Sequence, residues 1–390
     1  SELKKRVDRT GEVTEPEFTK SINLKVTDKE QDLSNANIYI ITVPTPVDKK
    51  NRPNLCPIEN ATKTVAKFLN KNDIVIYEST VFPGCTEELC VPILEKHSKL
   101  KYNIDFFCGY SPERINPGDK SHSLTKIIKI TSGSNQNVAD FIDELYSQII
   151  TAGTYKVSSI KIAEAAKVIE NTQRDVNIAL VNELSKIFRK MNLDTKEVLD
   201  AAKTKWNFLP FYPGLVGGHC IGVDPYYLTH KAKEIGFNPE IILAGRKIND
   251  SMGEFIANMT IDEIEKKGLS PSKSKITILG LTFKEDCPDL RNTKVISIIT
   301  TLEKFNCEII VSDIYADKNE SKHNYGIQLI DLSNIQGQDA VIVAVAHYEY
   351  KKLSKAQLEQ MLNPNGIIMD VKSIYDKKMF EKSLITHWRL

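Results

Sequence analysis

The residues best suited to covalent chemistry lie at 217–228, which read Gly-Gly-His-Cys-Ile-Gly-Val-Asp-Pro-Tyr-Tyr-Leu. Two glycines precede Cys220, and because glycine has no side chain they let a substrate approach the backbone beside the thiol. Asp224-Pro225 is typical of a helix start, with Asp as N-cap and Pro at the first helical position, and Gly236 is a typical stop. We therefore expect Cys220 on a tight loop leading into helix 225–235, where a thiolate is reachable and stabilised. The alternative is a buried structural cysteine.

A second group of polar residues interrupts an apolar helical pattern. The stretch from Ile160 to Met191 contains no Gly or Pro and predicts one helix of roughly 30 residues, about 45 Å long, enough to bridge two domains. Lys167 and Asn171 share one face of this helix, and Arg174 continues the stripe. One explanation is a solvated face. The other is that Lys167 and Asn171 converge on a substrate oxygen held against Cys220, where donors stabilise developing negative charge.

Polar residues also follow three predicted strands, at the edge where open α/β sheets bind ligands. The segments are Val43-Pro44-Thr45-Pro46, Glu78-Ser79-Thr80-Val81 and Ser111-Pro112-Glu113-Arg114. Any one of these segments could be an ordinary polar loop. Because all three are expected at the same edge of the sheet, together they favour a ligand-binding site. In the C-terminal part, Lys284 and Arg291 are two cations near a strand end, suited either to phosphate oxygens or to plain surface charge.

Apolar runs that alternate with helical patterns predict the elements that position these residues. Strands are expected at 38–45, 73–80, 104–111 and 127–130, with helices at 58–70, 87–98 and 135–149. Further strands are expected at 275–281, 308–312, 340–346 and 366–371. Such alternation indicates α/β domains with parallel sheets covered on both faces. The expected architecture is two Rossmann-like α/β domains, 1–156 and 263–390, joined by a long central helix and a helical middle domain, 157–262.

The composition excludes several classes of partner. Of 390 residues, 41% are hydrophobic and 26% charged, which is ordinary for a globular chain of two or three domains. The net charge of +1 argues against a nucleic-acid partner, and no apolar run reaches the roughly 18 residues of a membrane span. The seven cysteines include no CxxC, and the start Ser-Glu-Leu-Lys-Lys-Arg is unlike a signal peptide. We expect a cytoplasmic protein without a metal site.

Four motifs together resemble the nucleotide-sugar 6-dehydrogenases, the UDP-glucose/GDP-mannose dehydrogenase family. They run through nearly the whole chain in the family's order: Ser111-Pro-Glu-Arg114, Glu170-Asn171-Thr-Gln-Arg174-Asp-Val-Asn177, Val216-Gly-Gly-His-Cys220 and Gly280-Leu-Thr-Phe-Lys284. Val223 stands where the UDP-glucose branch usually has Lys, so the chain is more similar to the branch that acts on UDP-N-acetylhexosamines in surface-polysaccharide pathways. Oxidation of UDP-glucose or GDP-mannose is the alternative, and the hexosamine epimer is left open.

The resemblance implies an NAD-dependent, four-electron oxidation of the sugar C6 alcohol to a carboxylate. An aldehyde has no hydride to give until a nucleophile adds to it, so Cys220 would form a thiohemiacetal, and water would hydrolyse the resulting thioester. Lys167 and Asn171 would stabilise the oxyanion. Asp224 would place or activate water, with Thr80 and Glu113 near that water and the nicotinamide.

The resemblance also implies the binding residues. The NAD contacts would come from strand-end residues and one C-terminal cation: Val43, Pro44, Thr45, Glu78, Ser79, Thr80, Glu113 and Arg291. The UDP-sugar contacts would come from all three domains: Arg114, Lys167, Asn171, Arg174, Phe208, Phe211, Tyr212, Gly217, Arg246, Phe283, Lys284 and Lys372. Arg246 is expected to reach the substrate of a neighbouring subunit in a two-fold homodimer formed by the 157–262 region.

The family opens with a strand, a GxGxxG-type turn and an acidic residue, and this chain starts after all three. We therefore expect the expressed polypeptide to begin roughly 30 to 40 residues earlier. Two other classes are considered. One is a cysteine-dependent acyl hydrolase built on Cys220 and a histidine, although the adjacent His219 would point away from the thiol. The other is an inactive nucleotide-sugar-binding subunit, and NADH absorbance with UDP-N-acetylhexosamines separates the dehydrogenase from both.

Overall fold

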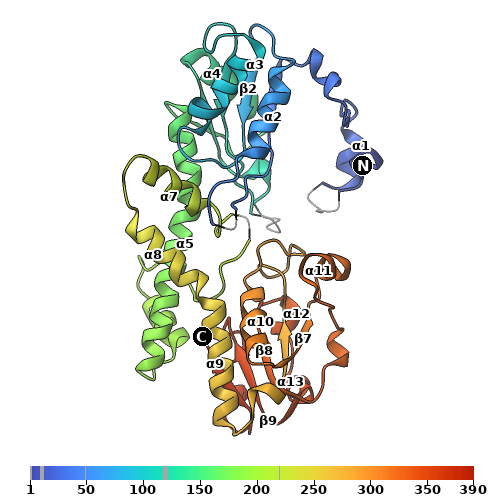
Figure 1. Cartoon of the computed structure of the whole chain (residues 1–390), viewed down its shortest axis with the longest axis vertical. Coiled ribbons are helices and arrows are strands. Elements are labelled where there is room, and N and C mark those ends of the chain that lie inside the picture. The colour runs from blue at the N-terminus through green and yellow to red at the C-terminus, as the bar shows by residue number, and fades with distance from the viewer. Residues whose placement is uncertain (1, 9–12, 49, 117–121, 219) are drawn as a thin grey trace.

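Two α/β parts stand at opposite ends of a long helical connector (Figure 1). The computed structural model describes residues 2–8, 13–48, 50–116, 122–218 and 220–390. The connector is α5, Ile160–Lys190, an unbroken helix of 31 residues that begins at the N-cap Ser159, whose side chain accepts a hydrogen bond from the backbone N–H of Ile162. The predicted long helix and the pair of Rossmann-like parts are confirmed. No helix within the described ranges is long and apolar enough to cross a membrane.

The N-terminal sheet has the strand order β1-β2-β3-β4-β5. Its strands are β1 Ile38–Ile41, β2 Ile74–Tyr77, β3 Phe107–Tyr110, β4 Lys129–Gly133 and β5 Thr154–Lys156. The first three strands pair in parallel as predicted, but β4 runs antiparallel to β3. The described part of the connection from β3 to β4 holds a 3₁₀ turn, Leu124–Lys126, and no α-helix, whereas a parallel return usually crosses over through a helix. The short strand β5 was not predicted.

Helices pack on both faces of this sheet. They are α2 Cys56–Ala66, α3 Val91–Ser98 and α4 Gln136–Ser147, and α3 continues a π-helical turn at Thr86–Cys90. A short helix, α1 Glu15–Lys20, lies before them in the chain. The sheet core is fully buried, with Val75, Ile76 and Tyr77 of β2 at 0% exposure, which is the continuous apolar burial of a strand covered on both faces.

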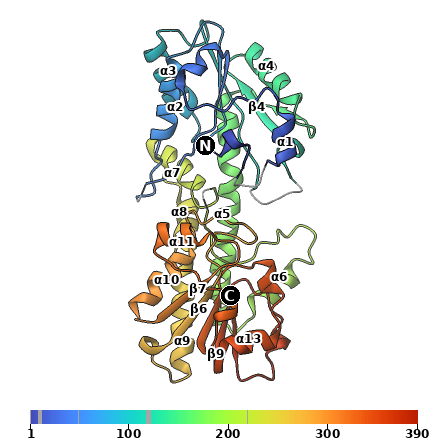
Figure 2. The same ribbon diagram turned by 90° about the vertical axis from the view of Figure 1, so that its right-hand side faces the viewer.

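The middle of the chain is helical. Beside α5 lie α6 Thr195–Ala202, α7 Asp224–Glu234, α8 Glu240–Asp250 and α9 Met252–Lys266, and both views show α7 and α8 along α5 (Figures 1 and 2). Helix α7 ends before Gly236, whose φ of +80° favours glycine, as predicted. The predicted N-cap role of Asp224 is wrong. Helix α7 already begins at Asp224, and the carboxylate of that residue is taken by a side chain of α5 instead of by the helix backbone.

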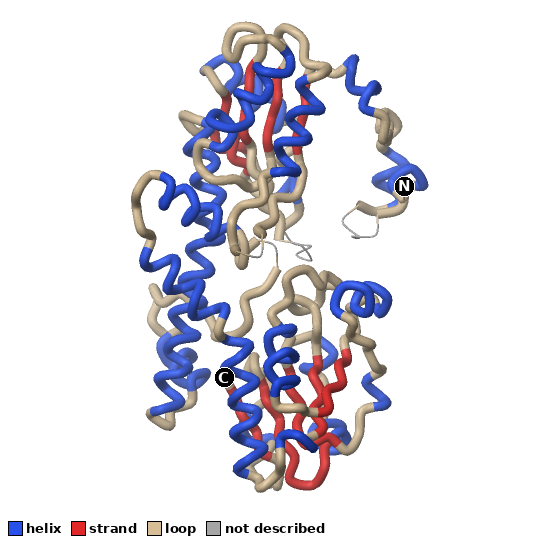
Figure 3. The backbone as a smooth tube through the Cα atoms, viewed as in Figure 1, coloured by secondary structure: helices blue, strands red, loops and turns tan. Residues whose placement is uncertain are grey.

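The C-terminal sheet is wholly parallel, in the order β10-β9-β8-β6-β7. Its strands are β6 Lys275–Leu279, β7 Glu308–Ser312, β8 Gln338–Val343, β9 Leu362–Asp370 and β10 Thr386–Arg389, and its helices are α10 Val295–Lys304, α11 Lys318–Tyr325, α12 Tyr348–Lys351 and α13 Lys355–Met361. Strand β10 was not predicted. Figure 3 shows the two sheets with loops between them. In such folds ligands bind at the carboxyl ends of the strands, so the region between the two sheets is where a ligand site is expected.

Candidate active site

A cavity of about 550 Å³ lies where the helical middle meets loops of both α/β parts. Its volume is in the range typical of sites for small molecules and cofactors. Eight residues predicted for the site line it: Arg114, Lys167, Asn171, Arg174, Gly217, Cys220, Phe283 and Lys284. The structure therefore brings together the thiol, the polar stripe of α5 and the two C-terminal residues that sequence reasoning placed on separate segments.

One hydrogen bond sets the thiol against the polar stripe of α5. The side-chain amide of Asn171 donates to the carboxylate of Asp224 over 2.6 Å, and the backbone N–H of Asp224 donates to the carbonyl of Cys220 over 2.8 Å. Lys167, one helical turn before Asn171, is only 6% exposed. A cation and an amide buried at this position need partners. Asp224 accepts the hydrogen bond of Asn171, and its carboxylate interacts electrostatically with Lys167.

The thiol itself is protonated at neutral pH. Burial raises the pKa of Cys220 to about 11; the charge of Asp224 adds to the rise, and the charge of Lys167 opposes it. Glu113 and Arg291 also act on this pKa, in opposite directions, which places both near the thiol. The expectation of a stabilised thiolate is therefore wrong for the unliganded site, because burial outweighs the nearby cations.

Asp224 is a buried carboxyl group that is still mostly ionised near neutral pH. Only 3% of the residue is exposed, and burial raises its pKa to about 6. The charge of Lys167 and the hydrogen bond from Asn171 lower that pKa and limit the rise. A carboxyl group with a pKa near 6 gains and loses a proton readily close to neutral pH. Beside the thiol, Asp224 is therefore suited to transfer a proton or to orient a water molecule.

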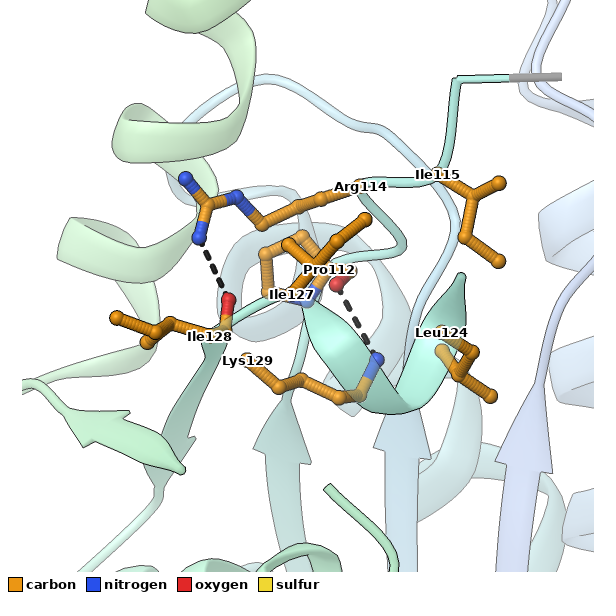
Figure 4. A pocket seen from close by; sticks show the side chains of 7 residues that line it. All are labelled: Pro112, Arg114, Ile115, Leu124, Ile127, Ile128 and Lys129. Atoms are coloured by element: carbon orange, nitrogen blue, oxygen red, sulfur yellow. Dashed lines mark hydrogen bonds between the residues drawn. The ribbon is translucent and has the colours of Figure 1, made fainter. Parts of the chain in front are cut away.

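The loop after β3 is held by two cations (Figure 4). Arg114 donates to the carbonyl of Ile128 over 2.7 Å and pairs with Glu170 of α5 at 2.6 Å, while Lys129 donates to the carbonyl of Pro112 over 3.2 Å. Both cations are thereby committed to the protein itself. Arg114 lines the cavity, but its guanidinium fixes the loop, so its expected substrate contact stays a prediction.

The predicted NAD residues lie at the carboxyl edge of the N-terminal sheet. Ser79 donates to the carbonyl of Val43 over 2.7 Å, which ties the ends of β1 and β2 together. Glu78 pairs with the buried Lys129 at 3.4 Å and accepts a hydrogen bond from Tyr146, so its carboxylate also serves the sheet. Val43, Pro44, Thr45 and Thr80 are partly or fully exposed at this edge, and are the residues that fit a ligand there.

Glu113 and Arg291 each have a partner within their own loop. Glu113 accepts a hydrogen bond from the backbone N–H of Ile115. Arg291 pairs with Asp289 at 2.5 Å, and its side chain is 60% exposed. Neither lines the cavity, although both influence the thiol electrostatically.

The C-terminal loops approach the thiol segment very closely, and glycine permits it. A side chain at Gly217 would come within 2.8 Å of the carbonyl of Asn292, and one at Gly218 (φ +81°) within 2.8 Å of the Phe283 ring. These glycines therefore serve the contact between protein segments as well as access to the thiol. Lys284 donates to Asn116 over 2.9 Å, which joins the two α/β parts across the cavity.

Three aromatic residues and one lysine from the predicted substrate set do not line the cavity. Phe208, Phe211 and Tyr212 are half-buried on the segment after α6, and Tyr212 donates to Asp200 over 2.8 Å. Lys372 lines a smaller neighbouring space of about 20 Å³, together with Phe283 and Lys284. The two spaces share residues, so Lys372 is close to the site.

Arg246 does not reach outward. It is 2% exposed, and its guanidinium pairs with Asp175 and Asp250, each at 2.6 Å, above the ring of Tyr226. The expectation that it contacts a neighbouring subunit's substrate stays a prediction, and within the single chain two carboxylates hold the guanidinium in the core.

Several lining residues were not predicted. They are mostly apolar or adjacent to predicted motifs: Ile115, Asn116, Glu170, Ile178, Ile221, Glu285 and Asp286. Sequence spacing could have predicted two of these lining residues. Ile178 lies four residues after Arg174 on the same stripe of the helix, and Asn116 directly follows the motif that ends at Arg114. His219, the partner considered for a cysteine hydrolase, lies outside the described residues.

Comparison with known proteins places the whole chain. Residues 12–150, 161–251 and 277–377 match the NAD binding, central and UDP binding domains of the UDP-glucose/GDP-mannose dehydrogenase family. Protein CapL of Staphylococcus aureus is 54% identical over 389 residues, covering 100% of this chain and 91% of CapL. A UDP-N-acetyl-D-glucosamine 6-dehydrogenase of Pseudomonas aeruginosa is 51% identical over 377 residues, covering 97% of this chain and 89% of the relative.

A solved structure agrees in fold. The UDP-D-ManNAc dehydrogenase of Pyrococcus horikoshii superposes with a TM-score of 0.86 at 30% identity, covering 96% of this chain and 86% of that one. The matched domains follow the order of the two sheets and the helices between them, and the cavity lies where the three domains meet. The chain therefore belongs to the UDP-glucose/GDP-mannose dehydrogenase family.

Proposed function

We propose that this protein oxidises the C6 hydroxyl of UDP-N-acetyl-D-glucosamine to the carboxylate, with NAD as cofactor. Two relatives that carry this activity in their names are 51% and 53% identical over nearly the whole chain, whereas UDP-N-acetyl-D-mannosamine dehydrogenases of Pyrococcus horikoshii and Methanocaldococcus jannaschii are 31% and 30% identical. The observation that carries the proposal is the meeting of Cys220, Lys167 and Asn171 in one cavity between the NAD binding and UDP binding domains.

The reaction needs a nucleophile because its second half starts from an aldehyde. The sulfur of Cys220 adds to the aldehyde carbon, and the thiol proton ends on the former carbonyl oxygen, giving a thiohemiacetal. Transfer of its C–H hydride to the bound cofactor, with loss of the hydroxyl proton to solvent, would leave a thioester on Cys220. Water then adds at the carbonyl carbon, and the carbon–sulfur bond breaks to release the carboxylate and the thiol.

Lys167 and Asn171 are placed to stabilise the oxygen on which charge develops in each addition. Lys167 supplies a buried positive charge and Asn171 a fixed N–H donor, both on one turn of a rigid helix, so little reorganisation is needed. Asp224 keeps Asn171 in place and is the base that orients the hydrolytic water. The high pKa of the thiol means that it gives up its proton during attack on the aldehyde.

The cofactor fits the carboxyl edge of the N-terminal sheet, where Val43, Pro44, Thr45 and Thr80 present partly or fully exposed groups next to the thiol segment. These residues would hold the nicotinamide half. NAD, when bound, accepts one hydride in each of the two oxidation steps. The hydroxyl of Tyr227 in α7 donates a hydrogen bond to the carbonyl of Pro46 over 3.2 Å. This bond holds the edge of the sheet against the helix that follows Cys220.

The nucleotide sugar fits the opposite side of the cavity. Lys284 and Lys372 are cations near a parallel sheet edge, suited to the diphosphate, and Phe283 lies between them and the Gly217–Gly218 backbone. Arg174 adds a third cation on the α5 side. We also propose that the partly exposed aromatic residues Phe208 and Phe211, on the segment before Gly217, contact the bound nucleotide sugar.

A substrate panel tests the proposal. NADH absorbance is followed with the UDP derivatives of N-acetylglucosamine, N-acetylgalactosamine, N-acetylmannosamine and glucose, and with GDP-mannose. We expect the highest kcat/KM for UDP-N-acetylglucosamine, with two NADH formed per sugar and a uronate identified by NMR. One NADH per sugar would contradict the thioester route, and UDP-sugar binding with no NADH at all would support the inactive-subunit alternative.

We further propose a homodimer that works in the cytoplasm on surface-polysaccharide precursors. Helix α5 keeps four large apolar residues about half exposed at spacings that share one face: Ile162, Ile169, Leu180 and Ile187. A second copy of the chain can cover this stripe. All seven cysteines are free thiols, four of them buried, which suits a reducing compartment.

A further inference from the structure

A buried histidine outside the cavity holds the loop that carries two of its lining residues. The loop, Gly280–Asp286, follows strand β6 and includes Phe283 and Lys284. His347 lies after strand β8, immediately before helix α12, and has 0% exposure. Its ring packs against that of Tyr350 with the centroids 5.3 Å apart. A fully buried imidazole needs a partner for each nitrogen.

Both nitrogens of His347 are used by this loop and its support. The backbone N–H of Asp286 donates to Nδ1 over 3.0 Å, so Nδ1 carries a lone pair and the proton sits on Nε2. Nε2 lies 3.2 Å from the carboxylate of Asp313 and 3.2 Å from the hydroxyl of Thr282. Nε2 is therefore the ring nitrogen that donates toward Asp313.

Asp313 completes the support at the start of the loop. Its carboxylate accepts the backbone N–H groups of Leu281, over 2.5 Å, and Thr282, over 3.0 Å. Burial raises the pKa of Asp313, but the hydrogen bond with His347 and those from the two backbone groups lower it to about 2. The hydroxyl of Thr282 then donates to the carbonyl of Lys284 over 2.9 Å. One network thus fixes both ends and the middle of the loop.

We propose that His347 is a positioning residue for substrate binding, which holds the Gly280–Asp286 loop so that Phe283 and Lys284 face the cavity. The inference rests on the proposed contact of Lys284 with the nucleotide diphosphate. His347 does not line the cavity and acts only through the loop. Loss of one of its hydrogen bonds should therefore weaken substrate binding without changing the chemistry at Cys220.

Two substitutions separate the hydrogen bond at Nδ1 of His347 from the one at Nε2. His347→Asn keeps an acceptor at the position of Nδ1 and removes the donor toward Asp313, whereas His347→Gln keeps a donor that can reach Asp313 and leaves the N–H of Asp286 without its acceptor. We expect each to raise the KM for the UDP-sugar about tenfold, with kcat changed less than about twofold. Faster hydrogen exchange in the peptide that covers the loop should accompany the change.

Two further variants separate positioning from general stability. Tyr350→Phe removes a buried hydroxyl that donates to the carbonyl of Ser312 over 3.1 Å, in the same core, so it should lower Tm and leave KM unchanged. Lys284→Ala should raise KM by itself, and adding His347→Asn to it should raise KM by a smaller factor than in the parent, because only Phe283 is then left to position.

The outcomes are distinct. Equal fold-increases in KM from His347→Asn with and without Lys284 would overturn the inference, as would His347 variants that lower only Tm, in the manner of Tyr350→Phe. A Lys284→Ala enzyme with unchanged KM would remove the proposed substrate contact, and this inference with it, whatever the His347 variants do.

Discussion

The side chains of Asn171 and Asp224 meet across 2.6 Å although 53 residues separate them in the chain. This bond joins the middle of α5 to the first residue of α7, and the backbone of the same aspartate holds the carbonyl of Cys220. The loop that carries the thiol is therefore fixed against the polar stripe of α5 in the unliganded protein. Acyl chemistry requires such preorganised donors beside the nucleophile.

Replacement of Cys220 should stop the reaction at the second oxidation. We expect Cys220→Ala to lose about three or more powers of ten in kcat for uronate formation, because no other thiol can take its place in the cavity. Binding of UDP-N-acetylglucosamine, measured by calorimetry, should stay within about threefold of the parent. Near-normal NADH formation by this variant would show that Cys220 is not the nucleophile.

The raised pKa of Cys220 predicts slow alkylation at neutral pH. Since that pKa is about 11, the rate of modification by iodoacetamide should climb with pH and show no plateau below about pH 10. Asp224→Asn removes a negative charge that raises this pKa and should speed the reaction at pH 8. Mass spectrometry of the Cys220 peptide distinguishes it from the exposed Cys56. A plateau near pH 7 in the parent would contradict the burial argument.

Asp224→Asn should also stabilise the fold as it removes activity. The folded pKa of Asp224, about 6, lies above its ordinary value of 3.8, so its contribution to stability is present below pH 3.8 and lost as pH rises through 6. Ionisation of this buried group therefore costs up to about 3 kcal/mol at pH 8, a cost that the neutral amide avoids. The Tm advantage of the variant should be larger at pH 8 than at pH 5, and a constant difference would refute the assignment.

Arg246 is predicted to support stability instead of substrate binding. Arg246→Ala leaves Asp175, which is 0% exposed, without its cation, and breaking such a buried pair costs about 3–5 kcal/mol. Denaturant unfolding should show this loss. Arg246→Lys, which keeps the charge but not the two-pronged contact, should lose less. A normal Tm for Arg246→Ala, together with a raised KM, would restore the original expectation of a substrate contact.

The apolar stripe on α5 gives a test of assembly. Ile169→Glu combined with Leu180→Glu places two charges on half-exposed positions and should convert a dimer into monomers in light scattering. Leu384→Glu, which places the same charge on an exposed apolar residue outside α5, is the matched control and should stay dimeric. A parent protein that is monomeric and fully active would rule out the proposed dimer.

The helices and strands that could be predicted from the sequence are those that depend on residues close together in the chain. Helix α5 was predicted because Ile160 to Met191 lacks the residues that break helices, and its polar stripe followed from the spacing of Lys167 and Asn171. The buried strands of the C-terminal sheet were predicted within a few residues for the same reason. Short strands such as β5 and β10 carry too few residues for a period to show.

What could not be predicted depends on partners distant in the chain. Asp224 has every local mark of an N-cap, yet Asn171 takes its carboxylate, so a tertiary contact overrides the local preference. Arg246 resembles a solvated or substrate-binding cation until Asp175 is found beside it. The pKa of Cys220 likewise follows from burial by segments that sequence spacing does not bring together.

The reactive constellation belongs to neither sheet. Cys220, Asp224, Lys167 and Asn171 all come from the helical middle, and the two α/β parts contribute loops around them. Either sheet could therefore be exchanged for that of a relative with another nucleotide or sugar without rebuilding the thiol and its partners. The helical middle can therefore be transferred between relatives as one catalytic unit. Chimaeras joined at the ends of α5 and α9 are the proteins in which to look for new combinations of cofactor and nucleotide sugar.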